Sequence, residues 1–257
     1  MTKSVLLSFA ALAALSAPAA AQQYVSGSVG VTMQTDSDNS GAFSRDFVTG
    51  DGVAVPAGVV LPSGTDVGWT TEFDTGLFVS AAYGYQLNEM FRVEAELSYQ
   101  SADVDTHTNV QAGGSALGAA DAAVLITGSA PLGVTDTDLV ADGQGELTST
   151  GLAINGYYDL PIENSPFALY AGAGLGLAEV KVDYAPSGVG IVDDTEMSAF
   201  FQAMAGGSYA ISDSTAFYGG YRYRVYEDAE TDSALIPAGL DVENASHILE
   251  LGVRYSF

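Results

Sequence analysis

Apolar and polar side chains alternate along eight stretches of this chain, and a repeat of two residues is typical of β-strands. The clearest stretch is Phe91–Gln100, in which every second side chain is apolar or aromatic and those between are charged or polar. The other stretches are Tyr24–Met33, Gly76–Leu87, Gly151–Leu160, Phe167–Val182, Ala199–Ile211, Ala216–Tyr226 and Ala245–Phe257. Each contains 10 to 16 residues, whereas a tilted strand crosses a bilayer with about 9–11 and soluble strands average about 5–6. We therefore predict an all-β protein with eight antiparallel, membrane-spanning strands.

The connections between these stretches alternate between short and long. The short connections are Asn88–Met90, Pro161–Pro166 and Ser212–Thr215, and the long ones are Gln34–Asp66, Ser101–Glu146, Asp183–Glu196 and Glu227–Glu243. This alternation is typical of an outer-membrane β-barrel, which has short periplasmic turns and long extracellular loops. The apolar segment Ala122–Gly128 could add one strand pair, so a ten-stranded barrel is the alternative.

Aromatic residues give a separate indication of a membrane. On the apolar side of the strands they gather next to the short turns, at Tyr85, Phe91, Tyr158, Phe167, Tyr209, Phe217, Tyr255 and Phe257. A ring of aromatic side chains at one height is expected at a membrane interface.

The N-terminus has the features of an export signal. Lys3 precedes an apolar run from Val5 to Leu15, and Ala19 and Ala21 occupy the positions that a signal peptidase reads. We expect cleavage after Ala21, which divides the chain into a signal peptide, residues 1–21, and a barrel, residues 22–257. An uncleaved membrane anchor is the alternative.

The predicted barrel is strongly acidic. The chain has 32 acidic and 7 basic residues, a formal net charge of −25, and no cysteine. This charge has the wrong sign for binding nucleic acid, and the absence of cysteine excludes disulfides and thiolate metal sites. The four long connections hold 22 of the acids and one basic residue, Arg45. Asp36 and Asp38 begin a weak match to a calcium-binding loop, but Phe47 stands where the loop needs a bidentate Glu, so we expect solvated acids and no metal.

The predicted strands direct equal numbers of positive and negative side chains into the barrel. They are Arg92, Arg222, Arg224 and Arg254 against Glu94, Glu96, Asp159 and Glu250. At about 3.3 Å per residue, Glu94, Glu96 and Arg254 should lie low, near the turns, and Arg222, Arg224 and Glu250 should lie at mid-height. An eight-stranded barrel is narrow enough for side chains to fill it. We expect a charge-paired lumen, with a gated pore for small solutes as the alternative.

Catalytic groups are sparse. Ser246 and His247 are adjacent, so in a strand they point to opposite faces and cannot form a dyad. His107 falls in a long connection near Asp103 and Asp105, where we expect it to be solvated. An enzyme acting on lipid or peptide is therefore a distant alternative.

Several segments resemble a known family. They are Phe167–Ala178, Ala205–Ser212, Gly220–Arg224 and Leu249–Phe257. They are similar to the small outer-membrane β-barrel family, often called porin-family proteins, that includes opacity-type surface antigens and the transmembrane domain of OmpA-like proteins. The last segment resembles the signal read by the barrel-insertion machinery, with Leu251, Val253, Tyr255 and the terminal Phe257 at alternate positions.

The resemblance implies an exported protein of the bacterial outer membrane, with membrane lipid and the insertion machinery as partners. Together with the residue patterns it predicts a non-enzymatic surface protein without cofactors. Its role would be in envelope structure or in contact with a partner outside the cell, made through the acidic loops. A small-solute porin is the second interpretation.

Overall fold

Eight strands close into an antiparallel barrel in the computed structural model. The structure describes residues 22–48, 58–119, 135–140, 143–185, 192–227, 229–232, 238–242 and 244–257. In order around the barrel they are β1 (Gln22–Gln34), β6 (Thr75–Gln86), β7 (Phe91–Ala112), β9 (Gly145–Pro161), β10 (Phe167–Tyr184), β11 (Val192–Ala210), β12 (Thr215–Tyr226) and β15 (Ala245–Ser256). The first and last strands pair and close the wall, with Val29 opposite Leu251. The predicted eight-stranded barrel is confirmed. The predicted signal peptide and the segment Ala122–Gly128 lie outside the described residues.

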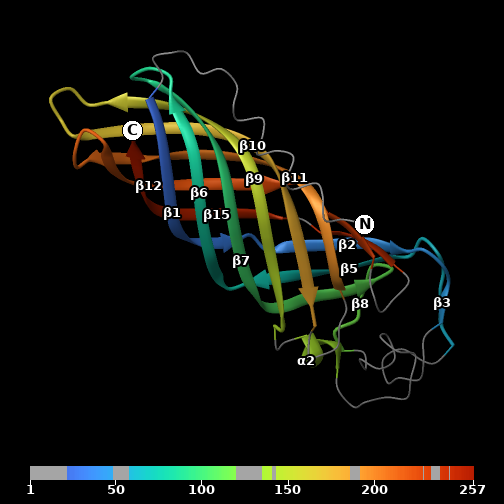
Figure 1. Cartoon of the computed structure of the whole chain (residues 1–257). Coiled ribbons are helices and arrows are strands. Elements are labelled where there is room, and N and C mark those ends of the chain that lie inside the picture. The colour runs from blue at the N-terminus through green and yellow to red at the C-terminus, as the bar shows by residue number, and fades with distance from the viewer. Residues whose placement is uncertain are drawn as a thin grey trace.

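The three short turns lie together at one end of the barrel, here called the turn end. The backbone N–H of Leu87 donates to the carbonyl of Phe91 at 2.8 Å, and that of Ile211 donates to Thr215 at 2.9 Å. Outward aromatic rings form pairs at this end, such as Phe91 with Tyr158. Figure 1 shows the C-terminus at this end and strands β2 and β5 at the opposite one, here called the loop end.

At the loop end the barrel wall continues into a second sheet. It contains β2 (Ser37–Phe43), β5 (Asp66–Phe73), β14 (Ala238–Val242), β13 (Ala229–Asp232), the short β8 (Ser115–Ala116) and the upper part of β7. The hairpin β3 (Phe47–Val48) with β4 (Val60–Leu61) and the helix α2 (Asp136–Val140) complete this end. All four predicted long connections contain strands, so the prediction of loops there was wrong for these segments: 37–43 in Gln34–Asp66, 101–112 in Ser101–Glu146, 192–196 in Asp183–Glu196, and 229–232 and 238–242 in Glu227–Glu243.

The apolar side chains of a strand change from the outward face to the inward face where the strand passes from the turn-end half into the loop-end half of the barrel. On β7, Leu97 and Tyr99 point outward and are exposed, whereas Ala102 and Val104, of the opposite parity, are buried inside. On β10, outward Leu177 gives way to inward Val180 in the same manner. Outward apolar residues face lipid in a membrane barrel, and inward apolar residues form a core where water is outside. This change explains why the predicted strand ended at Gln100.

None of the helices in the described residues is long and apolar enough to span a bilayer.

Candidate functional site

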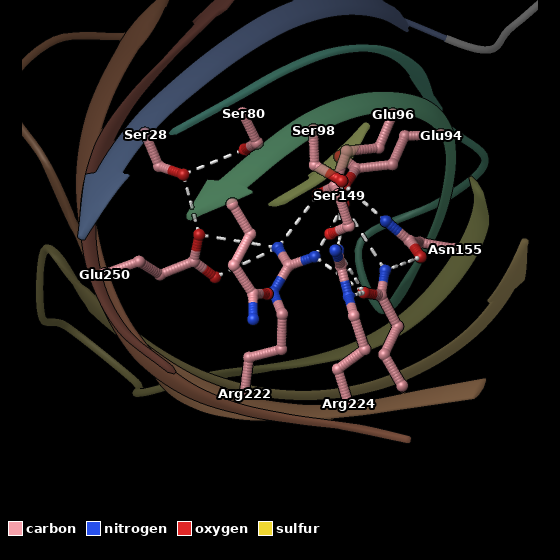
Figure 2. A network of polar contacts seen from close by, with 12 residues as sticks. Ser28, Ser80, Glu94, Glu96, Ser98, Ser149, Asn155, Arg222, Arg224 and Glu250 are labelled. Atoms are coloured by element: carbon pink, nitrogen blue, oxygen red, sulfur yellow. Dashed lines mark hydrogen bonds and ion pairs between the residues drawn. The ribbon is translucent and has the colours of Figure 1, made fainter. Parts of the chain in front are cut away.

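The central contact of the barrel interior joins Arg222 on β12 to Glu96 on β7, two strands on opposite sides of the barrel. The Arg222 guanidinium donates to both carboxylate oxygens of Glu96, with Nη2 2.8 Å from Oε2, and Nη2 also lies 3.1 Å from Oε1 of Glu250. Both Arg222 and Glu96 are 2% exposed. A bidentate pair satisfies two donors and two acceptors at once, and this pair reaches across the barrel interior. Figure 2 shows it at the centre of the network.

Arg224 extends the network towards the loop end. Its Nη2 donates to Ser98 Oγ at 3.1 Å and to Gln202 Oε1 at 2.8 Å, and lies 3.5 Å from Glu96 Oε1. The guanidinium also lies over the ring of Phe200, 4.5 Å from its centre. Arg224 therefore contacts polar groups on one side and an aromatic ring on the other.

A second cluster lies nearer the turn end. Nε of Arg92 donates to both oxygens of Asp159 at 3.0 and 3.1 Å, and its guanidinium stacks 3.9 Å from the ring centre of Tyr157. The Glu94 carboxylate accepts from the hydroxyls of Tyr24 at 2.8 Å and Tyr157 at 2.9 Å. The buried carboxylates are thus held mainly by neutral donors and by one arginine.

Glu250 connects the lumen to the strand that closes the barrel. It lies on β15, and its Oε2 accepts from Ser28 Oγ on β1 at 2.7 Å. Of the predicted insertion signal, Leu251, Val253 and Tyr255 lie on the same strand and Phe257 directly follows it, with 71% exposure for Leu251 and 59% for Phe257. Val253 and Tyr255 are also exposed.

Arg254 is placed differently from the other three lumen arginines. Among the described residues it makes no ion pair, and its guanidinium lies 5.7 Å from the ring centre of Tyr24. The sequence-based heights placed Glu96 beside Arg254, which was wrong, because Glu96 instead pairs at mid-height with Arg222 and Arg224. Strand tilt shifts the residues of different strands relative to one another, and the count from the turns ignores that shift.

The interior at the loop end is mainly apolar, and it also holds a buried polar group in which Thr71 contacts Asn39 and His107. Its buried core is formed by Phe43, Val67, Val104, Ala112, Leu147, Ala153, Ala178, Val180, Val182, Tyr184, Phe200, Tyr226 and Ala238. Trp69 and Phe73 pack against this core. Because these side chains come from the barrel strands and from the added strands alike, they fill the space above the charged network.

The structure corrects the prediction for His107 and agrees with that for Ser246 and His247. His107 lies on β7 and is buried, with Nδ1 2.9 Å from Thr71 Oγ1 and its ring 5.0 Å from that of Tyr184. It was expected to be solvated because the inward apolar side of upper β7 was not recognised. Ser246 points into the barrel, whereas His247 points outward and lies 2.6 Å from the Tyr221 hydroxyl.

The weak calcium candidates lie in or beside a strand. Asp38 is on β2 and accepts a hydrogen bond from Thr70 at 3.0 Å, and both Asp36 and Asp38 are exposed. Within the described ranges no group of three or more His, Asp or Glu side chains could hold a metal ion.

Four outward carboxylates stand in one row across adjacent strands at the loop end. Asp103 is opposite Glu146, Glu146 is opposite Asp183, and Asp183 is opposite Asp193. Like charges that face each other across a sheet repel. Lys181 offsets part of this repulsion, since its Nζ lies 3.7 Å from Asp183 and 4.0 Å from Asp193.

Sequence reasoning missed the neutral partners of the charged groups. Gln202 and Asn155 bond each other at 2.7 Å, and Gln202 also accepts from Arg222 at 2.9 Å. The sequence could have indicated these partners. Both residues occupy inward-pointing positions of predicted strands, and a buried amide needs a hydrogen-bond partner.

Comparison with known proteins gives the family. The sequence pattern of the family described as "Outer membrane protein beta-barrel domain" matches residues 7–257. No curated protein matches the chain. Among solved structures, OprG from Pseudomonas aeruginosa is similar with 13% identity and a TM-score of 0.57, covering 93% of this chain and 96% of OprG.

Two further structures are similar at lower TM-scores. Neisserial surface protein A has 17% identity and a TM-score of 0.42, covering 91% of this chain and 97% of its own. The outer membrane protease OmpT from Escherichia coli has 9% identity and a TM-score of 0.39, covering 91% and 97%. With most of its length matched, the chain belongs to the outer membrane protein β-barrel family, and this membership implies the bacterial outer membrane as its location.

Proposed function

We propose that this protein is a non-enzymatic, non-conducting barrel that stabilises the outer membrane and presents an acidic surface outside the cell. The proposal rests on side chains that bond across the interior in the turn-end half and pack together in the loop-end half. The turn-end half, the loop-end half and the exterior of the barrel each support this proposal through different contacts.

The turn-end half favours a closed barrel because its charged groups bond across the lumen. Arg222 and Glu96 join β12 to β7, and Arg92 on β7 bonds Asp159 on β9. A solute would have to separate these partners, and removing one partner of a buried ion pair costs about 3–5 kcal/mol. Such contacts support a structural role over a pore.

The loop-end half favours the same conclusion for another reason. Its apolar core excludes water, and an ion moved into such a medium loses its hydration. The ring contact between His107 and Tyr184 joins β7 to β10 inside this core. An aqueous path through both halves would need the core to open.

The exterior supports a role in surface contact. Asp103, Glu146, Asp183 and Asp193 face outward on strands that continue beyond the lipid-facing residues. Exposed carboxylates repel other anionic surfaces and favour cationic partners. The partners in this proposal are membrane lipid on the apolar band, the insertion machinery at the C-terminal strand, and an extracellular molecule at the loops, after cleavage of the signal peptide.

The absence of enzymatic activity is part of the proposal. In the described residues, Ser246 and His247 point to opposite sides of the wall, and His107 is buried within the apolar core. A nucleophile needs a base within hydrogen-bond reach in a space that substrate can enter. Neither histidine meets this condition with Ser246.

Single-channel recording in planar bilayers tests the proposal. The refolded wild-type protein and its Glu96→Lys variant should both give no steady channel openings, with a general porin as the positive control for insertion. Stable openings in the wild type would contradict a closed barrel. Openings that appear only in Glu96→Lys would show that the charge pairs act as a gate, which is the porin interpretation.

A further inference from the structure

Three polar aromatic side chains lie together on the outer wall of the barrel. His247 on β15 is opposite Tyr223 on β12, and its ring centre lies 5.0 Å from that of Tyr223 and 5.9 Å from that of Tyr221. All three side chains point outward and are at least partly exposed. The four arginines of the barrel strands point inward, so within the described turn-end half His247 is the one outward side chain that can become a cation.

His247 lies at the height where the outward apolar residues end. Its partner on β1 is Met33, the last outward residue before that strand ends at Gln34. On β12 only Val225 follows Tyr223 on the outward side of the strand. In a family member the loop end faces the outside of the cell. This height therefore corresponds to the boundary between lipid tails and headgroups in the outer leaflet.

The hydrogen bond to Tyr221 determines which ring nitrogen of His247 carries the proton. The Tyr221 hydroxyl lies 2.6 Å from Nδ1, a distance that is typical of an O–H donor and short for an N–H donor. The hydroxyl therefore donates to Nδ1, and Nε2 carries the hydrogen in the neutral ring. Nε2 makes no hydrogen bond within the described residues, so this donor is left for a partner outside the chain.

The acceptors at this height are water and the oxygens of lipid headgroups. A phosphate oxygen suits His247 best, because a protonated imidazole and a phosphate form a charge-assisted hydrogen bond. The faces of Tyr221 and Tyr223 also favour a cation beside them. Among the described residues no carboxylate forms an ion pair with His247, so none competes with a phosphate for the ring.

We propose that His247 binds the phosphate of a lipid headgroup in the outer leaflet. Nε2 donates to a phosphate oxygen, and the rings of Tyr221 and Tyr223 flank the imidazole. Tyr221 is a positioning residue, because its hydroxyl holds Nδ1 and leaves Nε2 as the donor. The inference rests on the proposed contact between the apolar band and membrane lipid, to which it adds the headgroup chemistry and the side chain that binds it.

Nitrogen-15 NMR of the imidazole rings tests the proposal, because the chain contains only two histidines. The refolded, untagged protein is placed in nanodiscs of digalactosyldiacylglycerol, a lipid without phosphate, and phosphatidic acid is then added. The Nε2 signal of His247 should shift, whereas that of the buried His107 should not. A His247 signal that does not respond, or that responds equally to inorganic phosphate alone, would overturn the proposal.

Native mass spectrometry measures how much of the lipid contact depends on these side chains. His247→Leu should bind phosphatidic acid about tenfold more weakly than the wild type, since it loses a hydrogen bond to a charged group. Tyr221→Phe should weaken binding and change the shifts of both His247 ring nitrogens, because the ring then populates both tautomers. Tyr99→Phe, which removes an exposed outward hydroxyl on β7, should bind as the wild type does.

All variants are compared as protein whose gel mobility remains heat-modifiable, as folded barrels are. Equal binding of phosphatidic acid by the wild type and folded His247→Leu would overturn the lipid site and leave the closed barrel in place. Stable channel openings in planar bilayers would contradict the closed barrel and leave the lipid site in place.

Discussion

The two halves of the barrel interior are filled by opposite kinds of side chain. The turn-end half contains arginines, carboxylates and amides that bond across the lumen, and the loop-end half contains an apolar core. The difference follows from what lies outside the wall. Where lipid covers the exterior, the side chains that point outward are apolar and those that point inward are polar or charged. Where water covers it, the same backbone buries its apolar side inward.

Substitutions in the two halves should lower the free energy of unfolding for different reasons. In the charged half, the loss of one partner leaves another charge buried without compensation, so the cost exceeds the value of the contact. In the apolar half, the loss of stability grows with the volume of the side chain that the substitution removes.

Arg222→Met should have the largest effect, lowering the free energy of unfolding by about 3–5 kcal/mol. It leaves Glu96 and Glu250 without their shared cation. Urea unfolding in lipid vesicles, followed by the fluorescence of the single tryptophan Trp69, measures the change. Adding Glu96→Gln and Glu250→Gln should restore most of the loss. A triple variant as unstable as Arg222→Met would contradict this explanation.

Leu147→Ala should lower the free energy of unfolding by about 2–4 kcal/mol, because it opens a cavity in the apolar core. Leu147 is 4% exposed. Leu175→Ala is the matched control, because Leu175 is 70% exposed on the outer wall and its removal creates no internal cavity. Equal losses for the two variants would mean that the loop-end interior is not a packed core.

Arg224 and Phe200 should be coupled, because they meet where the two halves join. The guanidinium lies 4.5 Å from the ring centre of Phe200, and such contacts contribute about 0.5–2 kcal/mol. A double-mutant cycle with Arg224→Met and Phe200→Leu should give a coupling energy in this range. Strictly additive effects would show that the two halves are energetically independent.

Lys181→Gln should have the smallest effect, about 0–1 kcal/mol. Lys181 and Asp183 form a half-exposed pair on the outer surface, with side chains 49% and 44% exposed. Added salt should reduce the difference between variant and wild type, because exposed pairs are screened. By contrast, a comparable dependence on salt for Arg222→Met would indicate that the lumen network is open to solvent.

The barrel itself could be predicted from sequence because lipid imposes one parity on every spanning strand. All eight strands and three turns follow from this pattern and from the alternation of short and long connections. The loop-end sheet was missed because the apolar side changes there from outward to inward. On β7 this change occurs between Tyr99 and Ala102, and it could serve as a marker of the membrane boundary.

The sequence identified which charged residues point into the barrel, but not which of them form ion pairs. Inward parity identified the eight charged residues, all of which line the interior. The partners depend on tilt and on side-chain length. Glu96 therefore reaches Arg222 across the lumen, whereas Arg254 lies over the Tyr24 ring and forms no ion pair within the described residues. Residue spacing along single strands does not contain this information.

Access of water to the lumen tests the central claim, which is that the interior is closed. The chain has no cysteine, so an introduced thiol is the only one to react. Ser98 is 2% exposed on β7 beside Arg224, whereas Ser115 on β8 is exposed at the loop end. Labelling by a small thiol reagent in folded protein should be at least about 100-fold slower for Ser98→Cys than for Ser115→Cys, and unfolding should remove the difference. Similar rates in the folded state would contradict a filled interior.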